Sequence, residues 1–343
     1  MRLWYNLRHM SVLVTGATGH IGCNLVRALL AKGRRVRVLL HRSRLGIEGL
    51  DVETVHGDVL DLDSLVRAFD GAEVIYHLAG YISLLPSDRP VMEAVNIQGV
   101  RNVVEACLRT GVRRLVHFSS IHAIKDTPER VIDETCDLVD SPQAPAYDRS
   151  KAAGEREVFK GLDRGLDAIT ISPTGVIGPH DYRPSHFGQA LLYMAQGKLP
   201  ALIAGGFNWV DARDVVAGAI TAEAQAPSGS KYLLSGHWVS VPEIAAITSE
   251  LTGVPAPGFV CPPWLALCGA PFLGAFDRIR GRQPLYTAMS IKSLQYHRHI
   301  SHEKASRELG YQPRPFRETL QDALSWFEQA GMLSSTAGRK EGR

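Results

Sequence analysis

Residues 12–31 read VLVTGATGHIGCNLVRALLA, in which a short apolar strand runs into a glycine-rich turn and then into a helix. Gly16 permits the tight turn, Gly19 lets a pyrophosphate approach the backbone, and Gly22 lets the helix pack close to the strand. The first N–H groups of the helix then face an anion. The pattern predicts a dinucleotide site that includes Gly16, Thr18, Gly19, His20, Ile21 and Gly22.

Short apolar segments alternate with helical patterns after this turn, which is typical of a parallel sheet covered on both faces. We therefore expect an α/β fold with a doubly wound (Rossmann) parallel sheet, right-handed crossovers and a smaller C-terminal lobe. The expected strands are 11–14, 36–40, 74–78, 114–118, 168–172 and 231–234, and the expected helices are 19–31, 63–69, 89–109, one starting near 147, 210–226 and 315–330.

The regular alternation stops after Pro179 and returns at Val210, so we expect two interleaved domains. The dinucleotide-binding domain is predicted to comprise 10–180 and 208–240, and the substrate-binding lobe 181–207 and 241–330, with flexible ends at 1–9 and 334–343.

The composition narrows the class of protein and its partners. With 45% hydrophobic and 21% charged residues, the 343-residue chain is typical of a packed protein. A net charge of +3 is too small for a protein that binds a nucleic acid backbone, so we expect no nucleic acid partner. Five cysteines without metal-binding spacing predict free thiols, a cytoplasmic location and no metal site. Five prolines interrupt the uncharged stretch 251–276, so we expect no membrane-spanning helix.

The segment after the second strand bears on the choice of cofactor. It carries His41 and Arg42 instead of the carboxylate that usually binds the ribose of NAD. These groups suit a 2′-phosphate, so we predict NADP, with NAD as the alternative if they are ordinary loop cations. Further expected cofactor contacts are Asp58 and Val59 near the adenine and Leu78, Ala79 and Gly80 at the end of the third expected strand.

Tyr147 and Lys151 lie four residues apart, which places a phenol and an ammonium on one face of a helix. We expect Lys151 to lower the pKa of Tyr147, which then exchanges a proton with a substrate oxygen. Ser120, after the fourth expected strand, is predicted to orient that oxygen, with Ser119 as the alternative. His122 is interpreted as a structural residue, because a lone histidine beyond a strand usually is one.

Together these features resemble the extended short-chain dehydrogenase/reductase superfamily over nearly the whole chain. The resemblance implies that Asp58 contacts the adenine, that Ser120, Tyr147 and Lys151 are catalytic, and that Asn96 lies near the active site. It also implies cofactor contacts by Pro173, Thr174 and Val176, although Ser172 stands where Asn or Arg is usual, and a homodimer built from the helices at 89–109 and 147–160. Segments 174–184 and 309–315, with Trp326 and Phe327, are most similar to dihydroflavonol-reductase-like proteins, 3β-hydroxysteroid dehydrogenases and hopanoid-associated sugar epimerases.

The predicted activity is the interconversion of a secondary alcohol and a ketone on a small molecule. The uncharged, aromatic stretch within 251–276 favours a hydrophobic sterol-, terpenoid- or flavonoid-like substrate and weak membrane contact. The alternative is that these apolar residues simply form the core of the smaller lobe. One rival is a nucleotide-sugar epimerase with retained NAD, for which Arg278, Arg280 and Arg282 are available cations; another is a non-catalytic cofactor sensor. The apolar residues of this stretch are Phe259, Val260, Trp264, Leu265, Leu267, Phe272, Leu273 and Phe276.

Overall fold

The computed structural model describes residues 11–83, 85–126, 130–270, 285, 287–296 and 299–334. Of the expected flexible segments 1–9 and 334–343, all but Ser334 lies outside the described residues. So do Phe272, Leu273, Phe276, Arg278, Arg280 and Arg282. Within the described ranges, every helix is too short or too polar to cross a bilayer.

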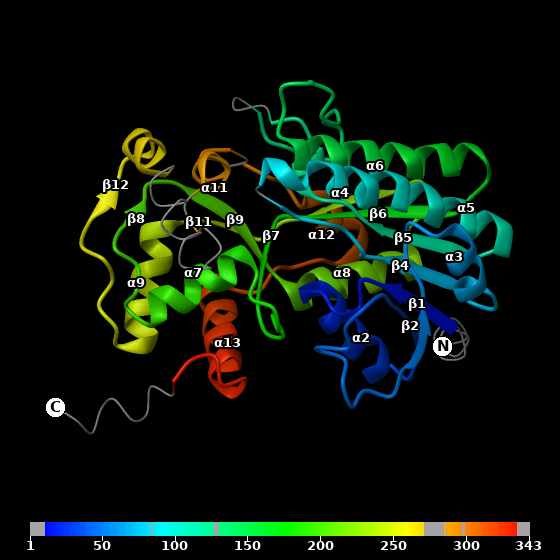
Figure 1. Cartoon of the computed structure of the whole chain (residues 1–343), viewed down its shortest axis with the longest axis horizontal. Coiled ribbons are helices and arrows are strands. Elements are labelled where there is room, and N and C mark those ends of the chain that lie inside the picture. Colours follow the sequence, from blue (N-terminus) through cyan, green and yellow to red (C-terminus); the bar gives the residue numbers. More distant parts are fainter. Residues whose placement is uncertain are drawn as a thin grey trace.

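A seven-stranded parallel sheet of order β10-β6-β5-β4-β1-β2-β3 forms the centre of the molecule (Figure 1), which confirms the predicted doubly wound parallel sheet and adds one strand to it. The strand order changes direction between β1 and β4, and ligands bind such sheets beyond the carboxyl ends of the strands at this point. The strands are β1 (Ser11–Thr15), β2 (Arg35–Leu40), β3 (Glu53–His56), β4 (Val74–His77), β5 (Arg114–Phe118), β6 (Ala168–Pro173) and β10 (Lys231–Leu234).

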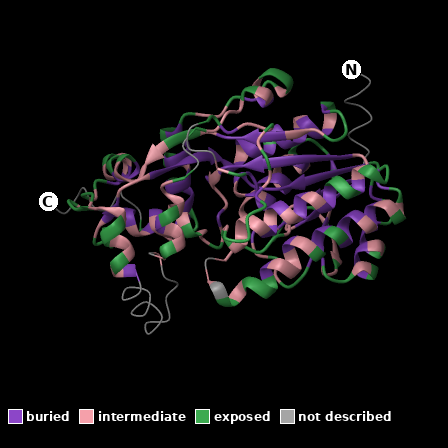
Figure 2. Cartoon of the chain, turned by 90° about the horizontal axis from the view of Figure 1, so that it is seen from above, coloured by how far each residue is buried: buried purple, intermediate pink, exposed green. Residues whose placement is uncertain are grey.

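Helices cover both faces of this sheet, which explains why its strands are almost continuously apolar. Along β1, Val12 and Val14 pack into one core and Leu13 into the other. Figure 2 shows the strands buried between the helical layers. The helices of one face are α2 (His20–Ala31), α8 (Ala212–Gln225) and α12 (Glu303–Leu309), and those of the other are α3 (Leu62–Phe69), α5 (Val100–Thr110) and α6 (Ala146–Asp163).

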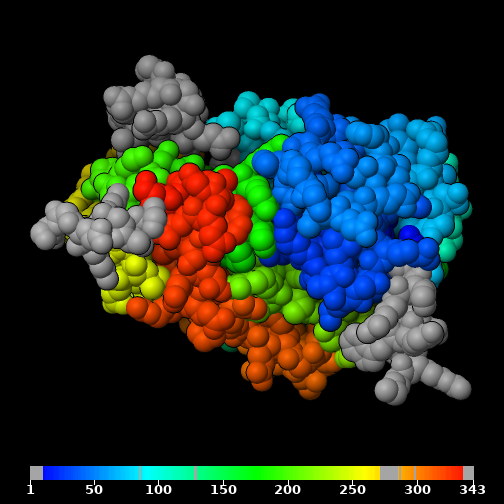
Figure 3. Space-filling model, turned by 90° about the horizontal axis from the view of Figure 1, so that it is seen from below, coloured from blue at the N-terminus to red at the C-terminus, as the bar shows by residue number. Residues whose placement is uncertain are grey.

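A smaller lobe lies beside the large sheet and is built on two small sheets of order β11-β9-β7 and β12-β8. The C-terminal segments join the two parts, because α12 packs against α8 and β10 while α13 packs against α7 and β9, as the orange and red regions of Figure 3 show. The elements of this lobe are β7 (Gly175–Ile177), α7 (His186–Ala195), β8 (Leu202–Ile203), β9 (Gly206–Asp211), β11 (His237–Ser240), α9 (Val241–Thr252), β12 (Val260–Cys261), α11 (Ala288–Ser293) and α13 (Phe316–Gln329).

Three local expectations differ from the structure. The edge strand β3 was not predicted, because its four residues are half-exposed and lack a clear apolar alternation. The helix expected from Val210 begins at Ala212, since Val210 and Asp211 complete β9. The helix expected at 89–109 is divided into α4 (Arg89–Glu93), a π-helical turn at Ala94–Gly99 and α5.

Candidate active site

The glycine turn between β1 and α2 brings backbone atoms unusually close together. Gly16 has φ +70°, and a Cβ there would lie 2.6 Å from the Ala79 nitrogen. A Cβ on Gly22 would lie 2.1 Å from the Gly16 carbonyl oxygen. Gly19 caps α2 without any side-chain hydrogen bond, which leaves the first N–H groups of the helix to a ligand. This cradle fits the pyrophosphate of a dinucleotide.

A cavity of about 550 Å³ extends from this turn to the start of α6, so the expected phosphate and catalytic groups face one space. Of the predicted site residues, the cavity is lined by Gly16, Gly19, His20, Ile21, Gly22, Leu78, Gly80, Asn96, Ser120, Tyr147, Lys151, Pro173, Thr174 and Val176. Thr18, His41, Arg42, Asp58, Val59 and Ala79 do not line it.

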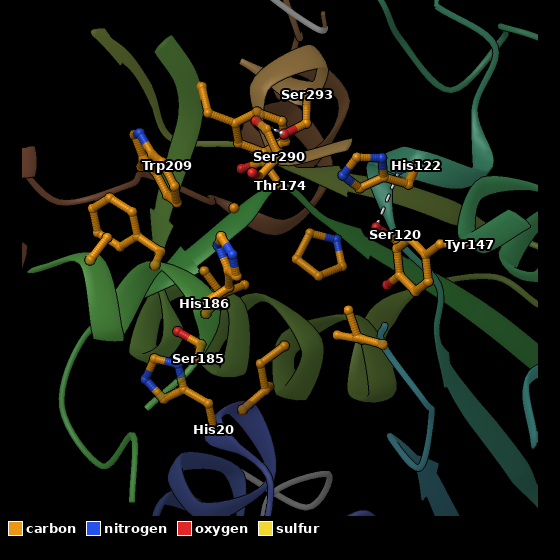
Figure 4. A pocket seen from close by; sticks show the side chains of 18 of the residues that line it. His20, Ser120, His122, Tyr147, Thr174, Ser185, His186, Trp209, Ser290 and Ser293 are labelled. Carbon is orange, nitrogen blue, oxygen red and sulfur yellow. Dashed lines mark hydrogen bonds between the residues drawn. The ribbon is translucent and has the colours of Figure 1, made fainter. Parts of the chain in front are cut away.

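Ser120, Tyr147 and Lys151 meet at the carboxyl end of β5 (Figure 4 shows the first two). The Ser120 hydroxyl accepts a hydrogen bond from the His122 backbone N–H at 3.2 Å and is also hydrogen-bonded to the Tyr147 phenol. Ser119, the alternative, donates instead to the buried Glu155 carboxylate at 2.6 Å. The arrangement therefore favours Ser120 as the partner of Tyr147.

We expected Lys151 to lower the pKa of Tyr147, but in the structure this pKa is raised, and the influences on it are burial, Ser120 and Asp148. Burial raises the pKa of Tyr147 to about 12, against the hydrogen bond from Ser120, and the Asp148 carboxylate raises it further. The Lys151 ammonium is directed elsewhere and donates to the Phe118 carbonyl at 2.9 Å. Burial lowers the pKa of Lys151 to about 8, with Glu155 acting in the opposite direction. Tyr147 is therefore a protonated phenol at neutral pH.

Asn96 lies in the π-helical turn and joins the loop after β4 to α6. Its side-chain oxygen accepts from the Tyr81 N–H at 2.8 Å, and its nitrogen donates to the Tyr81 carbonyl at 2.9 Å. The same nitrogen donates to the Ser150 hydroxyl at 3.0 Å. These bonds indicate that Asn96 fixes the cavity wall beside Gly80.

The groups expected at the adenine end are arranged around the loops after β2 and β3. His41 and Asp58 lie 3.3 Å apart and are both about half exposed, and the Arg42 side chain is also exposed. Val59 is buried, and its carbonyl accepts from Asn102 at 2.9 Å. This end of the site is therefore open to solvent.

The substrate side of the cavity has an apolar wall, and the described part of the stretch predicted to face the substrate does not line it. Phe259, Val260, Trp264 and Leu265 are exposed on the surface, while Leu267 packs against Ile203 and Ile291. The described wall instead comes from α7 and the loop after it, from β8 and β9, and from the start of α9. Its main apolar residues are Phe187, Met194, Leu199, Leu202, Ile203, Phe207, Trp209 and Val241.

The described lining of the cavity carries little charge. Among the described residues that line it, Lys151 is the only lysine or arginine, and there is no aspartate or glutamate. A nucleoside diphosphate needs cationic side chains or helix N-termini at its phosphates. The described lining offers one such side chain, while Arg278, Arg280 and Arg282 lie outside the described residues.

One residue that lines the cavity was not predicted to belong to the site. His122, interpreted as structural, lies in the cavity beside Tyr147, with ring centroids 5.5 Å apart. Its position two residues after Ser120 was the available signal.

Comparisons with known proteins agree with this geometry. The model of the NAD dependent epimerase/dehydratase family matches residues 12–234. Sterol demethylase protein B of Methylococcus capsulatus is 37% identical over 94% of this chain and 100% of its own length. A putative dihydroflavonol 4-reductase of Synechocystis is 32% identical over 94% of this chain and 96% of its own. The crystal structure of gox2253 has a TM-score of 0.82 and 32% identity, covering 94% of this chain and 99% of that one.

Proposed function

The chain belongs to the NAD dependent epimerase/dehydratase family, and from this premise we propose that it interconverts a secondary alcohol and a ketone on a hydrophobic, sterol-like molecule. One observation carries the substrate class: the cavity that joins the glycine turn to Tyr147 has an apolar far wall and, among its described residues, a single Lys or Arg. The name of the relative from Methylococcus capsulatus supports the sterol-like class.

Each of the three polar groups has a separate role in the proposed reaction. Tyr147 is protonated at neutral pH and donates its proton to a ketone oxygen, or regains one from an alcohol. Ser120 holds the same oxygen, and Lys151 places a positive charge beneath the site. The nicotinamide, when bound, supplies or accepts the hydride.

We further propose NADP as the preferred cofactor, with NAD as the alternative. His41 and Arg42 follow β2 and are exposed, so both can reach a 2′-phosphate, although His41 also faces Asp58 at 3.3 Å. Parallel titrations with NADP and NAD test this proposal. Tighter binding of NAD would overturn it.

The two rivals predict different behaviour of the purified protein. A nucleotide-sugar epimerase retains NAD and binds a uridine or thymidine diphosphate sugar, and a cofactor sensor binds the cofactor without turnover. We therefore propose assaying 3-hydroxysteroids and 3-ketosteroids by the absorbance of the reduced cofactor, and UDP-glucose by chromatography of the sugar nucleotide formed, because an epimerase leaves its retained NAD unchanged overall. Turnover of a steroid by the wild type and its loss in Tyr147→Phe support the proposed function. Turnover of the nucleotide sugar alone supports the first rival, and no turnover supports the second.

We also propose a homodimer formed through the helical face of α4, α5 and α6, which lie together in Figure 1. Val91 and Phe159 are exposed apolar residues on these helices. Light scattering of the protein as it elutes from a sizing column is expected to give the mass of two chains, and the V91E/F159E double variant the mass of one. A wild-type mass of one chain would contradict the dimer.

A further inference from the structure

We propose that His122, oriented by Asp148, is a second acid–base group of this site and transfers a proton at the carbon atom next to the substrate carbonyl. This inference rests on the proposed function and extends it. It narrows the substrate class to ketones, or alcohols oxidised to ketones, whose neighbouring carbon carries an acidic C–H bond.

The imidazole of His122 packs against two aromatic rings. It is stacked on Phe207, with centroids 5.8 Å apart and planes 18° from parallel. It makes an edge-to-face contact with the Tyr147 ring, with centroids 5.5 Å apart and an angle of 67° between the planes. Ser120 and His122 are also joined, because the Ser120 hydroxyl caps the short helical turn that carries His122. Figure 4 shows this ring beside Ser120 and Tyr147 at the cavity surface.

Asp148 fixes which ring nitrogen carries the proton. The Nδ1 atom of His122 lies 3.2 Å from the Asp148 carboxylate, and both side chains are largely buried, at 25% and 17% exposure. A carboxylate accepts a hydrogen bond, so Nδ1 carries the hydrogen and Nε2 is the basic atom of the neutral ring. A carboxylate that orients an imidazole in this way is a common device for making a general base.

The position of Asp148 is otherwise unfavourable for the hydride-transfer reaction. Its negative charge raises the pKa of the adjacent Tyr147, so that less phenolate is present at neutral pH to accept a proton from an alcohol. A phenol that stays protonated is suited to a different task, which is to donate a hydrogen bond to the oxygen of an enolate. His122 and Tyr147 together therefore form a base and an acid on either side of one carbonyl group.

The proposed step is balanced without any oxidant or reductant. The C–H bond next to the carbonyl breaks, and its proton goes to Nε2 of His122. The electron pair forms a carbon–carbon double bond, and the carbonyl π electrons move to the oxygen, which Tyr147 and Ser120 hold. Return of a proton from His122 restores the ketone, and in heavy water it restores it with deuterium.

The experiment measures this exchange separately from hydride transfer. Full-length protein is incubated in heavy water with 5α-androstan-3-one and oxidised cofactor, a combination that contains no alcohol to reduce the cofactor, so the ketone is not reduced. Mass spectrometry follows deuterium incorporation, and a second assay follows oxidation of the matching 3-hydroxysteroid through the absorbance of the reduced cofactor. The variants are His122→Gln, Asp148→Asn and, as a matched control, His299→Gln, an exposed histidine that does not line the cavity.

Catalysed exchange is expected in the wild type and in His299→Gln. It should fall about 100-fold or more in His122→Gln, the usual size of a general base contribution, while steroid oxidation falls only a few-fold. Asp148→Asn should reduce exchange by a smaller factor. Steroid oxidation without exchange in the wild type, or undiminished exchange in His122→Gln, would overturn the inference and leave the proposed function standing. Failure of both assays in the wild type would count against the proposed function itself.

Discussion

His77 and His117 form a buried, stacked pair beneath the active site, and we predict that this pair makes the fold sensitive to mild acid. They occupy paired positions on β4 and β5, with ring centroids 5.5 Å apart. His77 shares a hydrogen bond with the Thr15 hydroxyl at 2.7 Å, whereas both ring nitrogens of His117 lack a hydrogen-bond partner among the described residues. Burial, and then the charge of Lys151, lower the pKa of His77 to about 3 and that of His117 well below its usual value.

The size of the effect follows from these pKa values. In the unfolded chain a histidine has a pKa of about 6.5, so it is protonated at pH 5, whereas the same buried histidine stays neutral in the folded chain. Stability is therefore fully present above the unfolded pKa and falls as the pH drops below it. The gap of about 1.5 pH units at pH 5, at about 1.36 kcal/mol for each, gives about 2 kcal/mol for His77 and at most that amount for His117. The loss of stability from the pair between pH 8 and pH 5 is therefore at most about 4 kcal/mol.

The perturbation is His117→Phe, which keeps a stacked ring and removes one of the two titrating groups. Urea unfolding followed by tryptophan fluorescence gives the free energy of unfolding at several pH values. We expect the variant to lose less free energy of unfolding than the wild type between pH 8 and pH 5, by up to about 2 kcal/mol. His299→Gln is the control, because this side chain is exposed. His117→Leu gives the same measurement if the larger ring does not fit.

Other groups also titrate between pH 8 and pH 5, so the test depends on the difference between the wild type and the His117 variants. If His117→Phe, His117→Leu and the wild type lose the same free energy between pH 8 and pH 5, the pair is not buried and neutral as described, and the reasoning is refuted.

Three further substitutions test other parts of the site. Gly22→Ala should destabilise the fold by about 3 kcal/mol and abolish cofactor binding, because its Cβ would overlap the turn; thermal unfolding and cofactor titration measure both, with Gly258→Ala, which has open space around it, as the control. Arg42→Ala should weaken NADP binding about 10-fold and leave NAD binding unchanged, and equal losses for both cofactors would contradict the proposed phosphate contact. Asn96→Ala should lower kcat about 10-fold and raise KM, because Tyr81 loses the two bonds that fix its loop; unchanged kinetics would show that the loop is held by other contacts.

Features of the fold that depend on local patterns could be predicted from the sequence. The glycine spacing after β1 and the alternation of apolar segments indicated the parallel sheet, because both reflect neighbours along the chain. The edge strand β3 was not predicted, because its four residues pair with only one strand and show little apolar alternation. The start of α8 was predicted at Val210 instead of Ala212, because an apolar residue such as Val210 fits the pattern of either a strand or a helix.

Features of the site that depend on three-dimensional surroundings could not be predicted in the same way. The pairing of Tyr147 with Lys151 was visible as a spacing, but the direction of the Tyr147 pKa depends on burial and on Asp148. The apolar wall comes from α7, β8 and β9, which are neighbours in the sequence, and from the start of α9, but only the folded chain shows that their side chains line the same cavity as Tyr147. His122 was set aside because a sequence does not show which neighbours surround a side chain.

The most direct test of the account is a deuterium transfer measurement. A 3-hydroxysteroid carrying deuterium on its alcohol carbon is incubated with the protein and oxidised cofactor, and the cofactor is then examined by mass spectrometry. The account predicts that the wild type moves the deuterium onto the nicotinamide and that Tyr147→Phe does so at least about 100-fold more slowly. Unlabelled cofactor from the wild type with every hydroxysteroid tried, or equal transfer by Tyr147→Phe, would contradict it.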